Sequence, residues 1–443
     1  MRSAGAAAWA VALALWAAGR HAAGAEPPVR PAPAPASQGP GPAATPAPKS
    51  PGPGASTLRS GPVRLGIETL LAQGDGGLAG KRLGLVTNPS GVDSRLVPTA
   101  DLLARDRRWK LVRLYAPEHG VRGDLPAGAQ VKDTIDGPTG LPVESLYGDH
   151  KAPSAASLAE LDALVFDIQD IGSRTYTYIS TLGEVLRAAE RAEKPLYVLD
   201  RPHPLGGTEF EGPLREERWV SFISYGPMPV SHGMTVGEVA RFFRAEFDLQ
   251  VDLHVVPLSG WKRSMVFEDT GLAWVPTSPH IPHPSSAHLY IATGMVAAVT
   301  KNVNEGVGWT LPFEALAAEF IDARAFAQAL QSAGLPGVQF RETHFTPRYG
   351  KFQDKSLHGV QLHLWDPRAF LPVRTALVAL CTLQRMYGRQ LEWTDERNLG
   401  IHWGTTEVFQ ALRAGRTAAE IEAQWQPGLA AFARAREQAL IYD

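Results

Sequence analysis

An apolar run that ends abruptly in polar residues is the feature that most constrains how this chain folds. Residues 163–166 read Ala-Leu-Val-Phe, and Asp167, Gln169, Asp170 and Arg174 follow directly. A strand of a parallel sheet is covered on both faces, so it stays almost wholly apolar until its carboxyl end leaves the core. The run therefore predicts a buried parallel strand with chemically active side chains at its exit.

The same transition recurs in three other segments, at residues 83–89, 111–120 and 196–204. We expect strands at 82–87, 110–115, 163–167, 196–200 and 251–256, and helices at 96–104, 178–193 and 235–247. Alternating strands and helices imply right-handed crossovers and a doubly wound parallel sheet, an α/β fold. Ligands of such sheets bind beyond the carboxyl ends of the strands, at the switch point in strand order.

The pattern changes after about residue 262. Helices are expected at 313–320, 325–334, 374–387 and 417–440, and strands at 338–345 and 358–365. We therefore predict an α/β domain over residues 61–262 and a second, smaller α+β domain over residues 263–443.

The N-terminal region has the features of an export signal. Arg2 precedes an apolar segment at 6–18 and a small-residue ending at 23–25, which predicts a signal peptide over residues 1–25 that is cut before Glu26. The segment is too short to span a membrane. Residues 26–60 are rich in Pro, Ala, Gly and Ser and are expected to form an extended linker. The protein is thus expected in the periplasm or outside the cell.

Charge and motif spacing disfavour several classes of function. The formal net charge of −2 provides no field for nucleic acid or an anionic membrane. The glycine-rich segment at 74–80 precedes a strand instead of opening a helix after one, which argues against a dinucleotide site. His280, His283 and His288 lack the spacing of metal ligands on a helix. We therefore expect no cofactor and no metal.

The sequence Pro-Glu-His-Gly-Val-Arg-Gly at 117–123 places Glu118, His119 and Arg122 on a loop after a predicted strand. A carboxylic acid that protonates a leaving oxygen near neutral pH needs a raised pKa, which burial or a neighbouring carboxylate provides. Glu118 is our candidate general acid. The alternative is a structural carboxylate paired with Arg122 or His119.

The residues after 166 offer a second carboxylate and sugar contacts. Asp167, Gln169 and Asp170 are candidates to bind sugar hydroxyls, and Asp170 is a candidate catalytic partner of Glu118. Acids at strand ends also cap the following helix, so Asp167 is equally a candidate for a structural role.

Arginine and aromatic side chains follow in the same segment and in the next. Arg174 with Tyr176 and Tyr178 is a candidate to bind a carboxylate and an apolar sugar face, because a guanidinium matches a carboxylate in geometry. Core packing is the alternative for Tyr178. Arg201 is a candidate either to hold an anionic ligand group or to brace Asp170.

His232 lies on a loop ahead of a predicted helix. Thr235 and Glu238 have the spacing of a capping box, so Glu238 is predicted to be structural.

Taken together, these motifs resemble the bacterial exo-β-N-acetylmuramidase family, and the match runs from about residue 61 to residue 442. The matching stretches lie at 84–93, 117–123, 139–148, 166–179, 199–207 and 232–238. The resemblance implies a Rossmann-like domain, an auxiliary domain and a cleft between them. It implies release of N-acetylmuramic acid from the non-reducing end of peptidoglycan fragments, such as muropeptides and disaccharides of N-acetylmuramic acid and N-acetylglucosamine. Glu118 falls on the position of the expected catalytic glutamate, and the other residues on matching cleft motifs are Asn88, His119, Arg122, Asp167, Gln169, Asp170, Arg174, Tyr176, Arg201 and His232.

Two segments depart from the family pattern. Glu-Gly-Thr-Asn is common in the family, whereas this chain has Val-Thr-Lys-Asn at 299–302; Gly-Arg-Gly-Thr becomes Gly-Val-Gly-Trp at 306–309. Asn302 is retained as a candidate substrate contact. Lys301 or Glu305 is a candidate source of the missing charge.

The leading hypothesis is an exported glycosidase that uses Glu118 as general acid, with Asp170 or the acetamido group of the substrate as its partner. A protein that binds muropeptides without turnover is the alternative from a different class. Hydrolysis of another acidic amino sugar is a third possibility.

Overall fold

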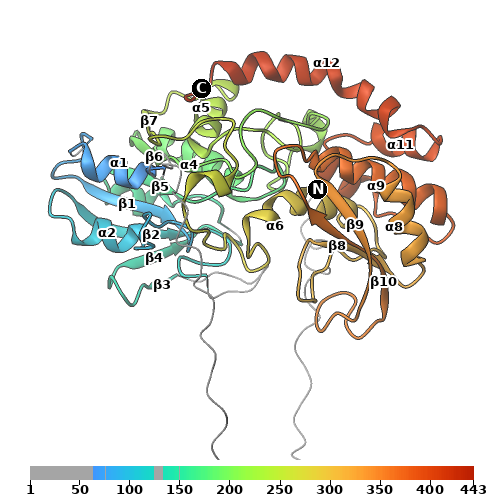
Figure 1. Ribbon diagram of the computed structural model, residues 1–443. Helices are drawn as coiled ribbons and strands as arrows, with labels where there is room; N and C mark the ends of the chain where they lie inside the picture. Colours follow the sequence, from blue (N-terminus) through green and yellow to red (C-terminus); the bar gives the residue numbers. More distant parts are fainter. Residues whose placement is uncertain (1–62, 75, 124–132, 149) are drawn as a thin grey trace, which may run out of the picture. The chain divides into compact units, whose positions relative to one another are not determined.

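A sheet of six parallel strands, with one short antiparallel strand at its edge, organises the first half of the computed structural model (Figure 1). The structure describes residues 63–443 except 75, 124–132 and 149, so the predicted signal peptide and linker lie outside the described residues. The strands are β1 (Arg82–Thr87), β2 (Lys110–Ala116), β3 (Thr134–Ile135), β4 (Pro142–Ser145), β5 (Ala163–Asp167), β6 (Leu196–Leu199) and β7 (Leu253–Val256).

The strand order β3-β4-β2-β1-β5-β6-β7 confirms a doubly wound sheet. Without the antiparallel β3, it is the order of a Rossmann fold, in which the chain first runs from β1 toward one edge and then returns to build the other half. The switch point therefore lies between β1 and β5, which pair in parallel from Leu83 opposite Ala163 to Thr87 opposite Asp167.

Side chains alternate between the two faces of this sheet, and helices cover both faces. Leu85 and Val165 face the core that includes α1 (Gly66–Ala72) and α2 (Thr99–Arg105). Val86 and Phe166 face the opposite core, formed with α4 (Tyr178–Arg191) and α5 (Val236–Glu246). The short α3 (Ala155–Ala159) precedes β5. The predicted capping box at α5 is confirmed. The Thr235 hydroxyl accepts from the Glu238 backbone N–H, and the Glu238 carboxylate accepts from the Thr235 backbone N–H.

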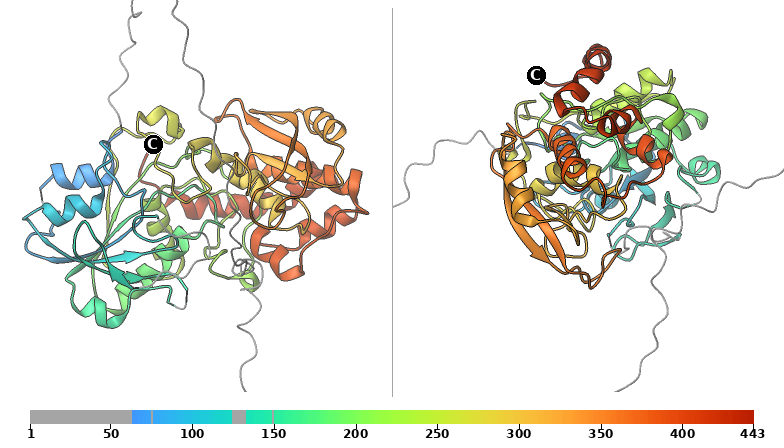
Figure 2. Two further views of the ribbon diagram at one scale, coloured as in Figure 1. Left: turned by 90° about the horizontal axis from the view of Figure 1, so that it is seen from below. Right: turned by 90° about the vertical axis from the view of Figure 1, so that its right-hand side faces the viewer.

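The second half is a smaller α+β arrangement, as predicted (Figure 2). Its antiparallel sheet has the order β8-β10-β9, with β8 (Ala315–Ala318), β9 (Val338–Phe345) and β10 (Leu357–Leu364). Its helices are α6 (Pro284–Leu289), α7 (Met295–Ala297), α8 (Ala323–Gln331), α9 (Pro372–Tyr387), α10 (Glu396–Trp403), α11 (Glu407–Arg413) and α12 (Ala418–Glu437). A π-helical turn (Tyr290–Gly294) joins α6 to α7.

The predicted helix at 313–320 is wrong. Residues Ala315–Ala318 form strand β8, which pairs with β10 from His358 opposite Ala318 to Gln361 opposite Ala315. Phe313 has φ of 64°, a left-handed conformation that a helix cannot continue through. Strand pairing therefore overrides the high helix propensity of an alanine-rich segment.

The described residues contain no helix that is long and apolar enough to cross a membrane.

The C-terminal segment returns to the first half of the chain (Figure 1). Phe432 of α12 packs edge-on against Phe242 of α5, with ring centroids 5.6 Å apart. Tyr442 donates a 2.5 Å hydrogen bond to Asp200, directly after β6. Burial raises the pKa of Asp200 to about 6, although this hydrogen bond opposes the shift.

Removing the Tyr442 hydroxyl is expected to destabilise the protein more at pH 7.5 than at pH 4.5. Asp200 has a folded pKa of about 6 against an ordinary value of 3.8, so stability falls as the pH rises through that window. In Tyr442→Phe the ionised carboxylate loses a donor, at a cost of about 1.5–3 kcal/mol in the free energy of unfolding. The protonated carboxyl at pH 4.5 loses less.

Urea denaturation at both pH values measures this difference. Tyr115→Phe is the matched control, because the Tyr115 hydroxyl donates to the neutral Ser157 and its loss should not depend on pH over this range. Equal destabilisation of Tyr442→Phe at the two pH values would contradict the assignment.

Candidate active site

Three loops that leave the sheet around its switch point carry the candidate catalytic residues. Asn88 follows β1 and Glu118 follows β2, while residues 168–177 follow β5. Because β2, β1 and β5 are neighbours in the sheet and run parallel, their carboxyl ends lie at one edge. The chain order of these strands thus brings the three loops together.

Glu118 lies at a sharp turn in the loop after β2. His119 has φ of 74° and Gly120 has φ of 83°, so the backbone reverses immediately after Glu118. A non-glycine residue in this conformation is strained, and such strain concentrates at functional sites. The half-buried Glu118 accepts a 3.2 Å hydrogen bond from Thr177 Oγ1, the residue that precedes α4.

The charges of Glu118 and Asp170 raise the pKa values of the same two tyrosines. Burial raises the pKa of Tyr290 to about 12, and the charges of Glu118 and Asp170 add to the shift. Burial also raises the pKa of Tyr178, again with contributions from both carboxylates. The ring of Tyr176 lies between these two, with centroids 4.9 Å from Tyr178 and 5.6 Å from Tyr290. The two predicted catalytic carboxylates therefore belong to one cluster.

Asp170 is buried, and it has one hydrogen bond and one close imidazole neighbour, whose Nε2 makes no hydrogen bond among the described residues. Its Oδ2 accepts a 2.6 Å hydrogen bond from the Gly172 backbone N–H and lies 3.4 Å from Nε2 of His232. His232 Nδ1 accepts from the Met234 backbone N–H, so a neutral His232 carries its proton on Nε2, toward Asp170. Asp170 Oδ1 is buried and has no hydrogen-bond partner among the described residues.

Thr277 connects several candidate residues and was not predicted from the sequence. Its carbonyl accepts from Asn88 Nδ2 at 3.2 Å and from the Tyr178 hydroxyl at 2.7 Å. Its hydroxyl lies 2.8 Å from the hydroxyl of Tyr176. No sequence motif marks Thr277, because its partners are about a hundred or more residues away.

His280, three residues farther along, lies near His119. Burial lowers the pKa of His280, and the charge of His119 lowers it further. His280 Nε2 is 3.1 Å from the hydroxyl of Tyr349, which is 44% exposed.

The second half of the chain adds an aromatic wall and a third carboxylate. The rings of Tyr290 and Phe313 meet with centroids 4.8 Å apart. Glu305 is half-buried, its pKa is raised by burial, and its charge also reaches Tyr290. Asn304 Oδ1 accepts from the Gly306 backbone N–H at 2.7 Å and so fixes the turn that carries Glu305. Lys301 and Glu305 are the two candidates for the missing charge, and the charge of Glu305 is the one that affects Tyr290 in this cluster.

Asp167 and Arg201 form a buried ion pair with each other. Arg201 donates from Nε to Asp167 Oδ1 at 2.5 Å and from Nη2 to Oδ2 at 3.0 Å. Thr99 Oγ1 also donates to Asp167, and Arg201 Nη2 donates to the Val92 carbonyl. Arg201 therefore braces Asp167, and the expectation that it braces Asp170 is wrong.

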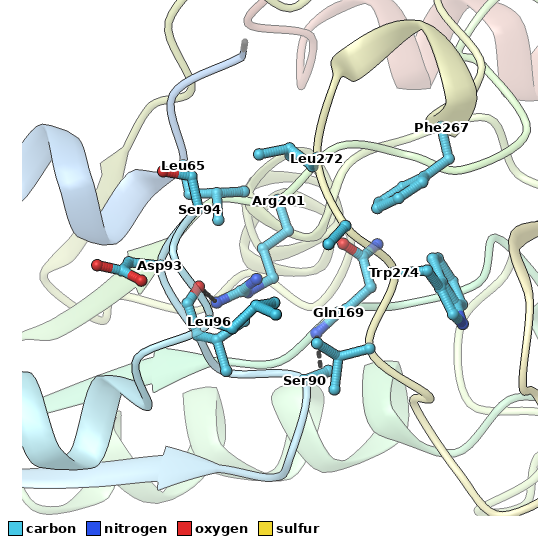
Figure 3. Close-up of a pocket in the computed structure, with 13 residues that line it drawn as sticks. Leu65, Ser90, Asp93, Ser94, Leu96, Gln169, Arg201, Phe267, Leu272 and Trp274 are labelled. Atoms are coloured by element: carbon cyan, nitrogen blue, oxygen red, sulfur yellow. Dashed lines mark hydrogen bonds between the residues drawn. The ribbon is translucent and has the colours of Figure 1, made fainter.

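A small cavity borders this ion pair (Figure 3). Figure 3 shows Arg201 and Gln169 between Leu96 on one side and Trp274 on the other. The volume is about 20 Å³, enough for about one water molecule and too small for a sugar ring. The cavity has no room for the anion that Arg201 was predicted to bind, and the Arg201 guanidinium is already hydrogen-bonded to Asp167.

Gln169 joins two loops. Its Nε2 donates to the carbonyls of Asp170 and Pro202, both at 2.8 Å, and its backbone N–H donates to Ser90 Oγ. These contacts give the side chain a structural role, and its predicted contact with a sugar stays a prediction.

Arg174 also differs from its predicted role. The side chain is fully buried and donates to the carbonyls of Pro213, Met228 and His402 at 2.8–3.1 Å. Burial lowers the pKa of Arg174 to about 9. With its guanidinium engaged in this way, Arg174 is not available to a ligand carboxylate.

Arg122 and Asn302 are both hydrogen-bonded to other parts of the chain. Arg122 forms ion pairs with Asp136 and Asp101, and the Arg122 hydrogen bonds lower the pKa of Asp136 to about 2. Asn302 donates to the Gln390 carbonyl and accepts from the Glu392 backbone N–H. Both residues thus stabilise local structure, and their predicted substrate contacts stay predictions.

Comparison with known proteins gives matches over nearly the whole described region. A family model described as "Exo-beta-N-acetylmuramidase NamZ, N-terminal" matches residues 83–285, and the corresponding C-terminal model matches residues 288–442. The predicted boundary near residue 262 stays a prediction. The peptidoglycan β-N-acetylmuramidase NamZ of Bacillus subtilis (strain 168) is 41% identical over 386 residues, which cover 87% of this chain and 93% of that protein.

Two crystal structures from Bacteroides fragilis NCTC 9343 share the fold. Both are DUF1343 family proteins, and the alignment with each covers 86% of this chain and 99% of theirs. One has a TM-score of 0.80 at 38% identity, and the other has a TM-score of 0.69 at 27% identity.

Arg201→Met is expected to lower the free energy of unfolding by about 3–5 kcal/mol, because it leaves Asp167 as an unpaired buried charge. Arg82→Met is the matched control. The Arg82 and Asp162 side chains are 48% and 38% exposed, so losing this ion pair should cost far less stability than losing the buried one. Urea denaturation compares the two variants. Wild-type stability in Arg201→Met, combined with weaker substrate binding, would instead assign Arg201 to the ligand.

Proposed function

Because this chain belongs to the exo-β-N-acetylmuramidase NamZ family and is a glycosidase of that family, we propose that it releases N-acetylmuramic acid from the non-reducing ends of peptidoglycan fragments. The observation that carries this proposal is the position of Glu118. A half-buried carboxylate on a strained turn lies at the switch point of a doubly wound sheet, within electrostatic reach of the same tyrosines as a second carboxylate. Glycosidases generally work with such a pair.

In this mechanism Glu118 is the general acid that protonates the glycosidic oxygen as the bond to the muramic sugar breaks. Thr177 positions its carboxyl group through the 3.2 Å hydrogen bond. A positioned proton donor of this kind accelerates a reaction by about 10²–10⁴-fold.

Asp170 is the proposed partner of Glu118. Gly172 orients it through Oδ2, His232 Nε2 lies 3.4 Å from the same oxygen, and Oδ1 remains for the substrate or for an attacking water. Where the acetamido group of the sugar supplies the nucleophile, Asp170 orients that group instead of attacking the sugar itself.

We also propose that the protein is exported and acts in turnover of the cell wall. The motif at residues 1–25 supports export, and a peptidoglycan substrate lies outside the cytoplasmic membrane.

The mature protein is then expected to begin at Glu26. N-terminal sequencing of the protein from periplasmic and medium fractions checks this position. Recovery of the full-length chain from the cytoplasm alone would exclude export.

Glu118→Gln is expected to slow cleavage of the disaccharide of N-acetylmuramic acid and N-acetylglucosamine by about 10²–10⁴-fold. A nitrophenyl glycoside of N-acetylmuramic acid should lose less, because nitrophenolate leaves with little help from an acid. Measuring kcat on both substrates therefore separates proton donation from sugar binding.

Glu217→Gln is the control, because its side chain is 90% exposed and its loss should leave both rates unchanged. Disaccharide cleavage by Glu118→Gln within threefold of the wild-type rate would defeat the assignment. An equal loss on the two substrates would show that Glu118 has a role other than general acid.

A further inference from the structure

A groove on the second half of the chain is separate from the proposed catalytic residues. Its volume is about 600 Å³, and its lining includes Leu289, Glu314, Gln339, His363 and Trp365. None of the carboxylates assigned to catalysis above lines it. Its size falls within the range of small-ligand sites in proteins.

Trp365 contributes a large aromatic side chain to the groove, and this residue is 79% exposed. Its backbone is fixed, since the Trp365 N–H donates to the Gly337 carbonyl at 2.8 Å and the Asp366 N–H donates to the same carbonyl at 3.1 Å. Gly337 has φ of 70°, and a Cβ there would lie 2.3 Å from the Asp366 carbonyl. The strand end thus presents a large apolar ring to solvent on a rigid backbone.

Polar side chains continue from Trp365 along one face of the sheet. His363 lies opposite Gln339, and Gln361 lies opposite Arg341, so the four share a face. Arg341 donates to Gln361 Oε1 at 2.6 Å, and its Nε lies 3.4 Å from His363 Nε2. Gln361 in turn hydrogen-bonds Glu314.

The groove and the carboxylate cluster share a wall. Leu289 lines the groove, and the next residue, Tyr290, belongs to the cluster. Glu314 lines the groove, and the preceding residue, Phe313, packs on Tyr290. The groove is thus joined to the aromatic part of the cluster through adjacent residues of the chain.

We propose that this groove is a second carbohydrate site, which binds pyranose rings of a peptidoglycan glycan strand with one ring stacked on the indole of Trp365. A pyranose has an apolar face of C–H groups and a rim of hydroxyls, which matches an exposed indole next to a row of amide, imidazole and carboxylate groups. The row contains both a carboxylate and a guanidinium, so it does not select a polyanion. The identity of the sugar rests on the proposed function, whereas the groove itself does not.

The test measures binding to insoluble peptidoglycan in a background that cannot turn it over. The full-length chain carrying Glu118→Gln is sedimented with purified sacculi, alone and combined with Trp365→Ala. We expect Trp365→Ala to weaken binding about tenfold, which corresponds to about 1.4 kcal/mol. Ile135→Ala is the matched control, because Ile135 is a 62% exposed apolar side chain outside the groove and its loss should not alter binding.

Turnover by a protein that keeps Glu118 distinguishes this site from the catalytic one. Trp365→Ala alone is expected to cleave the soluble disaccharide with unchanged kcat and KM, because Trp365 lines the groove and the proposed catalytic residues do not. A raised KM for the disaccharide would place Trp365 in the catalytic site and overturn the proposal.

Equal sedimentation with and without Trp365→Ala would also overturn the proposal. A wild-type dimer that Trp365→Ala dissociates would overturn it too, because the groove would then bind a second copy of the chain. Binding to sacculi that depends on Trp365 in a protein that releases no N-acetylmuramic acid would refute the proposed function and leave the groove assignment standing.

Discussion

The buried ion pair between Asp167 and Arg201 holds the switch point of the sheet together. Asp167 ends β5 and Arg201 follows β6, while Thr99 and the Val92 carbonyl attach the segment after β1 to the same pair. Two charges buried in this way cost several kcal/mol each in desolvation unless their geometry is good and their remaining lone pairs and protons are satisfied. Here these hydrogen bonds supply that compensation, so the loops that leave three strands are tied to one another at their origin.

Residues that hold the fold together and residues proposed for catalysis lie only a few positions apart in the sequence. Asp167 stabilises the strand ends, while Asp170, three residues later, is left with one oxygen uncommitted. Arg174 continues the same segment into the interior, where it fastens three backbone carbonyls. Charged side chains that look equivalent in the sequence thus divide into those that fix loops and those that keep an oxygen without a hydrogen bond.

Sequence patterns predicted the sheet well, because buried parallel strands need continuous apolar runs. The bounds of β1, β5 and β9 agree with the predicted ones. The segment at 313–320 failed, since its pairing with β10 depends on contacts about 40 residues away. The roles of Glu118, Asp170 and His232, which motifs after strands suggested, stay predictions. These motifs misassigned arginines such as Arg174, because a guanidinium serves backbone carbonyls as readily as a ligand and sequence does not distinguish the two partners.

The π-helical turn at Tyr290–Gly294 has a consequence for how this site tolerates insertions and deletions. A π-helical turn holds one residue more than an α-helical turn, so loss of a single residue within it would leave an ordinary α-helical turn that keeps α6 and α7 in register. Tyr290 and the Thr293 hydroxyl, which donates to the Phe313 carbonyl, could not then both keep their positions. The extra residue of the π-helical turn therefore sets the directions of Tyr290 and Thr293 relative to each other.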